Sequence, residues 1–333
     1  MTKEYLNLVV LHNIATVKED EGIKIFYPYQ QDIEIIRSIK NLPYKVSSKL
    51  YDGDLSDLKD VLVVNLCDAF TNPEDELNLI KSFEKNRLAY TGCGYETVKN
   101  CQNKFFAKKI FEENRIRTPS SRLFKNENEN LGELKFPLIL KLNNEDASIG
   151  LDEDSVVFNE EELRKKLSQL FLKYNKEVLA EEYIEGREFN VPIIGNDNPE
   201  ALNVLEIDYS KEFENKPKIL TYKAKWSKNS NDFKNTYSNI TKIEDNEKEK
   251  IISTAIKAYK ALKCTGYASV DVRMNDKNEI FVIEINANCY IAQESDMLKA
   301  ALSQGISYEE LLEKVINYAA ERFSLNKDLA IIE

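Results

Sequence analysis

Histidine is nearly absent from this sequence, because His12 is the only one among 333 residues. A hydrolase built on a Ser-His-Asp or Cys-His arrangement would need that single residue, and a zinc site would need cysteine and acid ligands at unusual spacing. His12 follows the apolar run Leu6–Leu11, so we expect it to end a strand and not to act as a base. Catalysis would then rest mainly on lysine, arginine, carboxylates and a bound metal.

Long apolar runs, paired cysteines and excess positive charge are also missing. No apolar run approaches the roughly 20 residues that span a membrane, and the N-terminus lacks the charged and apolar blocks of a signal peptide. The five cysteines show no C-x-x-C spacing, which favours reduced thiols in a cytoplasmic protein. The formal net charge of −11 argues against a nucleic-acid surface, which is basic. We expect a cytoplasmic protein that binds neither a membrane nor nucleic acid.

The most informative pattern is a hairpin with polar residues on one face. Two β-branched segments, about Tyr267–Met274 and Glu279–Asn286, flank a polar turn. Because side chains alternate along a strand, Glu284 and Asn286 share a face, and Asp271 can lie opposite them. Two carboxylates and an amide oxygen suit Mg²⁺, which binds one or two carboxylates together with substrate phosphates. The alternative is a solvated polar face, although aspartate and asparagine are poor strand formers.

Four further segments precede this hairpin in a fixed order. They are Asn103-Lys-Phe-Phe-Ala-Lys108, Phe136-Pro-Leu-Ile-Leu-Lys141, Ala147-Ser-Ile-Gly150 and Val178-Leu-Ala-Glu-Glu-Tyr-Ile-Glu-Gly-Arg-Glu188. Together with the hairpin they resemble the ATP-grasp superfamily, in particular enzymes similar to D-alanine–D-alanine ligase. The resemblance runs from about Val61 to Ala320. It implies ATP as cofactor with Mg²⁺, or with Mn²⁺ as an alternative.

The chain is long enough for two or three compact units. Strands alternate with helices over the first hundred residues, which predicts a parallel sheet with helices on its faces. The predicted fold class is α/β with α+β lobes, and the resemblance makes it an ATP-grasp fold after a Rossmann-like domain. The expected domains are the Rossmann-like domain 1–98, the small central lobe 99–185, and the large C-terminal lobe with the metal site, 186–333. The first domain lacks a Gly-x-Gly-x-x-Gly turn, so it is not expected to bind a dinucleotide.

Local patterns predict further elements in the C-terminal lobe. Strands are expected at Leu202–Leu205 and Ile219–Lys223, and a mobile polar loop at Asn229–Asn239. Ser307 and Glu310 form a capping-box signal for a final helix.

The resemblance also implies a nucleotide site. Lys104 and Lys141 would contact the phosphates, and Ser148 belongs to a loop that covers them. Each lysine alone would usually be a surface residue, and the acidic residues a solvated strand end. The adenosine would lie at the hinge, with Glu181 accepting from the adenine amino group and Glu188 from the ribose hydroxyls. The backbone groups facing adenine would be those of Glu182 and Ile184.

The substrate residues follow from the same resemblance. Lys225 would lie near the terminal phosphate and the substrate carboxylate, Ser295 would hold the second substrate's carboxylate, and Trp226 takes the place of a substrate-facing tyrosine. With Lys225 and Ser148, Arg273 is a candidate catalytic residue. It either contacts phosphate or pairs with Glu284.

Several positions depart from the pattern of the resembling family. A glutamate for the first substrate's amine has no counterpart near His12–Glu21, and Ala147 stands where serine is usual. Ser269 replaces an arginine, and Cys289-Tyr290-Ile291 replaces Pro-Gly-Met. The changes touch the substrate site and spare the ATP site, which favours a different first substrate. Because Trp226 can only donate, an acidic or N-acylated substrate is expected.

The sequence therefore predicts an ATP-dependent carboxylate–amine (or –thiol) ligase. It would form an amide or peptide-like bond through an acyl phosphate and release ADP and phosphate. The alternatives are a true D-alanine–D-alanine ligase, an ATP-grasp phosphotransferase and a nucleotide-binding regulator without turnover. The expected partners are a small carboxylate and a small amine, whose identities stay open, and a homodimer is compatible with the sequence.

Overall fold

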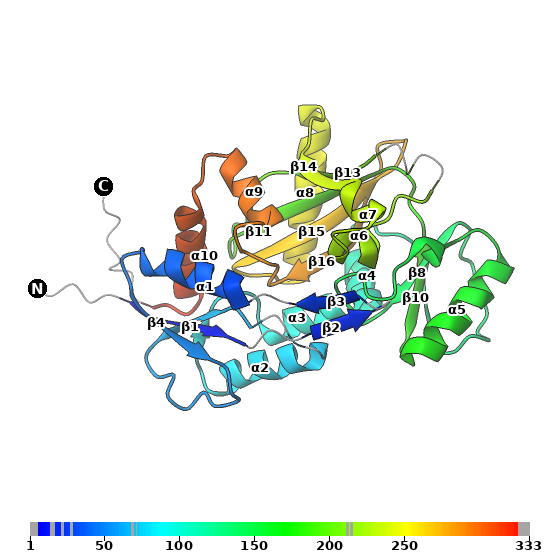
Figure 1. Ribbon diagram of the computed structural model, residues 1–333. Helices are drawn as coiled ribbons and strands as arrows, with labels where there is room; N and C mark the ends of the chain where they lie inside the picture. The colour runs from blue at the N-terminus through cyan, green and yellow to red at the C-terminus, as the bar shows by residue number, and fades with distance from the viewer. Residues whose placement is uncertain are drawn as a thin grey trace, which may run out of the picture.

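The computed structural model describes residues 6–13, 17–20, 23–26, 29–67, 70, 72–210, 213 and 216–325. Within these ranges the chain forms three main sheets and a small hairpin of β2 (Val17–Asp20) and β3 (Ile23–Phe26). Figure 1 shows the N-terminal sheet at the lower left, the large sheet in the centre and the small lobe at the right.

The N-terminal sheet is parallel, with the order β4-β1-β5-β6. Its strands are β1 (Asn7–His12), β4 (Lys45–Leu50), β5 (Leu62–Asn65) and β6 (Ala89–Tyr90). Its helices are α1 (Tyr29–Lys40), α2 (Pro73–Lys85), α3 (Tyr95–Gln102) and the C-terminal α10 (Tyr308–Arg322), which packs on α1. The predicted parallel sheet is confirmed, because short β-branched runs such as β5 are buried on both faces. His12 ends β1, as expected.

The small lobe is an antiparallel sheet with the order β7-β10-β8-β9. The strands are β7 (Ser121–Phe124), β8 (Leu138–Leu142), β9 (Val156–Val157) and β10 (Val178–Glu182). Helix α5 (Glu160–Tyr174) covers one face and shares with the strands a hydrophobic core separate from the rest of the molecule. Helix α4 (Lys104–Glu113) leads into this lobe, and η1 (Glu153–Ser155) precedes β9.

The large sheet carries the predicted hairpin and is antiparallel, with the order β14-β13-β11-β15-β16 and β12 paired to β11. Its strands are β11 (Arg187–Ile194), β12 (Glu200–Ala201), β13 (Leu205–Tyr209), β14 (Thr236–Ile240), β15 (Tyr267–Met274) and β16 (Ile280–Ala287). Helix α8 (Asp245–Ala261) packs against β15 and β16 (Figure 1). Helix α9 (Asp296–Ser303) contacts β11 and β14, α7 (Asn231–Lys234) contacts β14, and α6 (Tyr222–Trp226) contacts α7 and β3.

The N-terminal and large sheets share one hydrophobic core, in which Val9 and Leu11 lie in the same cluster as Val191 and Val270. The guanidinium of Arg322, at the end of α10, adds polar contacts across this junction. It donates to the backbone oxygens of residues 90 and 92 and to the Thr265 hydroxyl. The small lobe therefore faces a single packed body made of the other two sheets.

Two predicted elements are wrong. Ile219–Lys223 is not a strand, because the Thr221 side chain accepts a hydrogen bond from the Ala224 amide and caps α6 instead. The predicted loop at Asn229–Asn239 contains α7 and β14, a polar edge strand of alternating exposure. The strand predicted at Leu202–Leu205 is displaced: residues 202–204 are not in a strand, and β13 begins at Leu205. The capping box at the start of α10 is confirmed.

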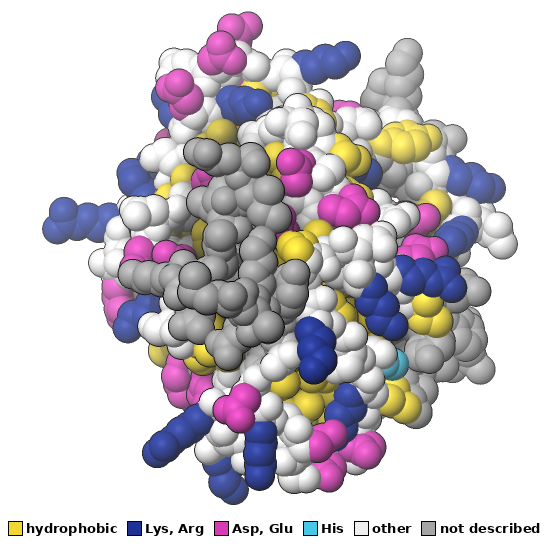
Figure 2. Space-filling model, turned by 90° about the vertical axis from the view of Figure 1, so that its left-hand side faces the viewer, with side chains coloured by type: hydrophobic (Ala, Val, Ile, Leu, Met, Phe, Trp, Pro, Cys, Tyr) yellow, Lys and Arg dark blue, Asp and Glu magenta, His cyan; other side chains and the backbone are white. Residues whose placement is uncertain are grey.

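The sequence predicted a protein that binds neither nucleic acid nor a membrane, and the surface and the helices bear on these two expectations. On the face that Figure 2 shows, basic and acidic side chains of the described residues are mixed, and they form no basic patch there. No described helix is long and apolar enough to cross a membrane. No disulfide joins the five cysteines, all of which lie in described ranges. The domain boundaries at 98 and 185 stay predictions.

Candidate active site

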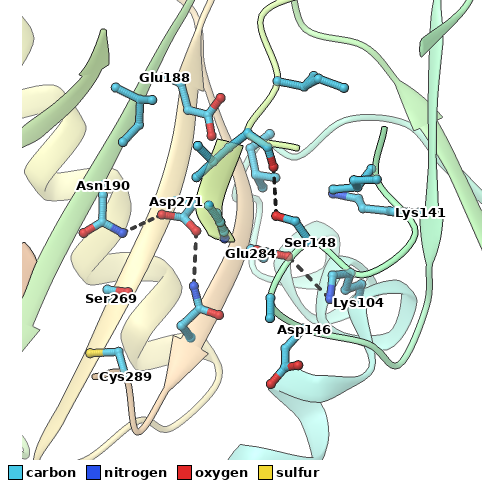
Figure 3. A pocket seen from close by; sticks show the side chains of 18 of the residues that line it. Lys104, Lys141, Asp146, Ser148, Glu188, Asn190, Ser269, Asp271, Glu284 and Cys289 are labelled. Carbon is cyan, nitrogen blue, oxygen red and sulfur yellow. Dashed lines mark hydrogen bonds and ion pairs between the residues drawn. The ribbon is translucent and has the colours of Figure 1, made fainter. Parts of the chain in front are cut away.

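A cavity of about 610 Å³ opens between the small lobe and the large sheet (Figure 3). The small lobe contributes β8, the hinge segment after β10 (Tyr183 and Ile184) and part of the Ala147–Gly150 loop. The large sheet contributes β11, β15 and β16. Every site residue predicted from the sequence lines it: Lys104, Lys141, Ser148, Glu181, Glu182, Ile184, Glu188, Lys225, Trp226, Asp271, Arg273, Glu284, Asn286 and Ser295. The fold thus brings together residues that lie up to 191 positions apart, from 104 to 295.

The three predicted metal ligands lie together on the large sheet. Asp271 on β15 stands opposite Glu284 on β16, and Asn190 on β11 stands on its other side. Asn190 Nδ2 donates to Asp271 Oδ1 at 2.6 Å, and Asn286 Nδ2 donates to Asp271 Oδ2 at 3.2 Å (Figure 3). The Asp271 carboxylate is therefore held by donors from both neighbouring strands. Asn190 was not predicted from the sequence.

A β-bulge shapes β16, the strand that carries two of the predicted metal ligands. The register shifts after Asp271, so that Val272 pairs with Val282 and Ile283 is the extra residue. As a result Val282 is fully buried in the core, while Ile283 and Glu284 both line the cavity. The bulge allows Glu284 to face Asp271.

Burial and charge act in opposite directions on the two carboxylates. Burial, and then the negative charge of Glu284, raise the pKa of Asp271 to about 7. Burial would also raise the pKa of Glu284, but Lys104, Lys141 and other nearby lysines lower it to about 2. The raised pKa of Asp271 indicates a carboxylate that added positive charge would stabilise. The charge of Glu284 is already balanced by the nearby lysines.

Lysines from the opposite wall face these carboxylates. Lys104 begins α4, and its ammonium lies 3.5 Å from Glu284 Oε2 and donates to the Glu145 carbonyl. Lys141 on β8 is buried and lies 2.5 Å from Glu181 Oε1. Lys225 on α6 completes the set of cavity lysines. A strip of positive charge thus runs beside the carboxylates, as a site for phosphate groups requires.

The hinge end of the cavity holds Glu181, of which only 2% is exposed. Lys141 contacts one of its oxygens, and Lys108, which the sequence reasoning missed, lies 2.6 Å from the other. Glu188 accepts a hydrogen bond from the Tyr209 hydroxyl at 3.0 Å. The adenine and ribose roles predicted for Glu181 and Glu188 stay predictions.

This arrangement matches known proteins. The family model described as D-ala D-ala ligase C-terminus matches residues 106–317, which is 212 of the 333 residues. A D-alanine–D-alanine ligase of Carboxydothermus hydrogenoformans is 33% identical over 244 residues, or 70% of this chain and 74% of that protein. D-alanine–D-alanine ligase A of Bacillus cereus is 31% identical over 71% of this chain and 73% of its own length.

The chain belongs to the D-alanine–D-alanine ligase family. Its fold is an ATP-grasp fold, because the crystal structure of a Bacillus anthracis D-alanine–D-alanine ligase complexed with ATP superposes with a TM-score of 0.75. That superposition covers 97% of this chain and 99% of the other, at 22% identity. The protein is an ATP-dependent ligase that joins a carboxylate to an amine.

Arg273 lies beside Glu188 and Tyr183 in this ligase. Its guanidinium lies 3.8 Å from Glu188, 4.9 Å from the Tyr183 ring centroid and 3.4 Å from the Gly186 carbonyl. Of the two alternatives predicted for Arg273, pairing with Glu284 is wrong, because Arg273 lies opposite Phe281 and its guanidinium faces Glu188. Arg273 therefore lies at the hinge end, although it lines the cavity and contact with phosphate stays a prediction.

The Ala147–Gly150 loop of the ligase is fastened to the segment that carries α6. Ala147 and Ser148 both have positive φ angles, of 55° and 61°. The Ser148 hydroxyl donates to the Leu220 carbonyl at 2.8 Å, and the Trp226 indole N–H donates to the Ala147 carbonyl at 3.0 Å. Because the indole N–H already has an acceptor in the protein, it is not a free donor for the substrate. The donor-only argument for an acidic first substrate is therefore wrong in this detail.

The remaining departures also line the ligase cavity. Ser269 lies opposite Asn286 on the paired strand, and both line the cavity with Cys289. Ser295 is buried and caps α9, its hydroxyl accepting from the Leu298 amide at 3.1 Å. The carboxylate-binding role of Ser295 stays a prediction.

Proposed function

We propose that this ligase activates its carboxylate substrate as an acyl phosphate and then transfers the acyl group to an amine. The observation that carries the proposal is the meeting of Asp271, Glu284 and Asn286 with Lys104, Lys141 and Lys225 in one cavity. The carboxylate oxygen attacks the γ-phosphorus of ATP, the bond to the β-phosphate oxygen breaks, and ADP leaves. The amine then attacks the acyl carbon, loses a proton and expels phosphate, which leaves an amide.

The donor set fits a divalent cation, Mg²⁺ or alternatively Mn²⁺. Two carboxylates and an amide oxygen are hard oxygen ligands, and Mg²⁺ prefers such ligands together with phosphate oxygens. Among the described residues no group of three or more His, Cys, Asp and Glu could hold a metal alone. Asp271, Glu284 and Asn286 would therefore share the ion with the nucleotide. A bound cation would neutralise charge at the terminal phosphates.

The side chains of this protein supply binding and charge, not a nucleophile. Lys104, Lys141 and Lys225 would offset the charge that develops on the transferring phosphoryl group. The Ala147–Gly150 loop, fastened by Trp226, would exclude water from the acyl phosphate, which hydrolysis would otherwise destroy. The chemistry needs no histidine, in agreement with a chain that has only one.

The first substrate is proposed to differ from D-alanine. An ammonium in a closed site needs an acidic partner, because an unpaired buried charge is costly. Neither Ala147 nor Trp226 supplies one, and the Trp226 donor is occupied within the protein. An ammonium would have to pair with another acid of the cavity, such as Glu76 or Glu294. Residues 14–16 and 21–22, in the segment where the family glutamate was sought, lie outside the described ranges. An acid without a free α-amine, such as an N-acylated one, suits these contacts.

D-Alanine–D-alanine ligation is the second candidate, since relatives at 33% and 31% identity are named for it. A direct comparison separates the two: ADP release with D-alanine alone, against a panel of amino acids and small carboxylic acids in pairs. Fast turnover with D-alanine alone, with the dipeptide identified by mass spectrometry, would support the second candidate and contradict the first. A phosphorylated product without free phosphate would instead indicate a phosphotransferase.

The cytoplasmic location and the homodimer stay proposals. Sedimentation equilibrium of the purified protein would measure the assembly directly.

A further inference from the structure

Lys108 is a fully buried lysine just outside the cavity. It lies on α4, one helical turn after Lys104, and its side chain is 0% exposed. Lys104 lines the cavity, whereas Lys108 does not, and its ammonium contacts Glu181. A buried ammonium needs several acceptors, so its neighbours indicate what it is for.

The three acceptors of Lys108 come from different parts of the molecule. The ammonium lies 2.6 Å from Glu181 Oε2 on β10, and it donates to the Thr118 hydroxyl at 2.9 Å and to the Ile283 carbonyl at 3.4 Å. Glu181 forms the hinge end of the cavity, where it also holds Lys141. Ile283 is the extra residue of the bulge in β16, directly before Glu284.

The chain beside Lys108 holds the same bulge. The Thr118 hydroxyl donates to the Val282 carbonyl at 2.8 Å, and the Val282 amide donates to the Arg117 carbonyl at 2.9 Å. Both carbonyls next to the register shift, those of Val282 and Ile283, thus accept from one small cluster around Lys108. The cluster therefore contacts the two backbone carbonyls that directly precede Glu284.

The charges around Lys108 do not have the pattern of a stabilising ion pair. Glu181 is shared by two buried lysines, so Lys141 alone would balance its charge. Burial lowers the pKa of Lys108, and the positive charge of Lys141 adds to this, against the attraction of Glu181. Removing one partner of a buried ion pair is costly when it leaves a charge unpaired, but here Lys141 would remain as the partner of Glu181. A second lysine in this position therefore calls for a role other than stability.

We propose that Lys108 is a positioning residue. It links Glu181, which lines the proposed nucleotide site, to β16, which carries the proposed metal ligands Glu284 and Asn286, by its contact with the Ile283 carbonyl. This inference rests on the proposed function. It makes nucleotide binding and metal binding depend on one side chain that touches neither ligand.

The test compares Lys108→Met with the control Lys109→Met. Lys109 is the next residue of the same helix, but its side chain is 45% exposed and pairs with Glu112 at the surface. Lys108→Met leaves Glu181 paired with Lys141, so no carboxylate is left without a buried counter-charge and the variant should fold. The probes are the non-hydrolysable analogue AMPPNP, measured by calorimetry without a divalent cation, and Mn²⁺, measured by electron paramagnetic resonance at an AMPPNP concentration that saturates each variant.

The expected result is a loss of about tenfold in affinity for both AMPPNP and Mn²⁺ in Lys108→Met, as for other residues that support metal ligands, and no loss in Lys109→Met. A loss for AMPPNP with unchanged Mn²⁺ affinity, or the reverse, would overturn the link, and so would wild-type affinity for both. If Lys108→Met does not fold, Thr118→Val decides. That variant keeps all charges, and unchanged affinity for both probes would overturn the proposal, whereas a smaller loss for both supports it. Failure of the wild type to bind AMPPNP would instead contradict the proposed function, and this inference with it.

Discussion

The Asn190 side chain donates to Asp271 across two strands of the large sheet, at 2.6 Å between Nδ2 and Oδ1. Asn190 is buried, and a cavity-lining carboxylate that could otherwise rotate is held by this contact from one side and by Asn286 from the other. Such orientation by a residue that need not touch the metal is a common requirement of metal sites.

Asn190→Ala should weaken Mn²⁺ binding by about ten- to a hundredfold, because the Asp271 carboxylate loses its strongest orienting donor. Mn²⁺ titration in the presence of AMPPNP measures the effect. The matched control is Asn239→Ala, which removes a similar cross-strand hydrogen bond to Asp208 on the exposed edge of the same sheet. Equal Mn²⁺ affinities in the two variants would contradict the role of Asn190.

Millimolar ATP with Mg²⁺ should raise the melting temperature, because a ligand that binds only the folded state stabilises it. At about 100 times the dissociation constant the gain is about 2.7 kcal/mol. Differential scanning fluorimetry with ATP alone, Mg²⁺ alone and both together measures it. An absent shift with both ligands at neutral pH would count against the nucleotide site.

Trp226→Phe should loosen the Ala147–Gly150 loop, since it keeps an aromatic ring but removes the donor to the Ala147 carbonyl. A hydrogen bond of about 1 kcal/mol corresponds to roughly a fivefold rise in KM for ATP if it forms only in the closed state. Trp226→Tyr offers a different donor and serves as the comparison. Faster proteolysis of the loop in Trp226→Phe without nucleotide would support the same interpretation, and an unchanged KM would contradict it.

The sequence predicted the hairpin of β15 and β16 well, because the alternation of side chains along a strand and the residues of a turn act over short distances. Strands β15 and β16 follow from the order of residues alone, whereas Asp271 comes to face Glu284 through a register shift between the two strands. The bulge at Ile283 could not be predicted in the same way, since it depends on the pairing register with another strand.

The errors in the C-terminal lobe have a local origin. Thr221 signals a helix N-cap, but the apolar residues Ile219 and Leu220 before it imitate a strand. Lys108 gave a signal that was overlooked: it falls on the buried stripe of α4, between Ala107 and Phe111, where a lysine is unusual. Its partners could not be predicted, because Glu181 and Ile283 reach it only through the tertiary fold.

The most direct test of the proposed ligase is Glu284→Gln in a coupled ADP-release screen over acid and amine pairs. Glu284 faces Asp271 and Lys104, and glutamine keeps its shape while removing the charge that a divalent cation requires. We predict that the wild type releases ADP and phosphate in equal amounts with at least one pair, and that the variant folds normally but releases neither. ADP release by the purified variant at the wild-type rate would contradict the account.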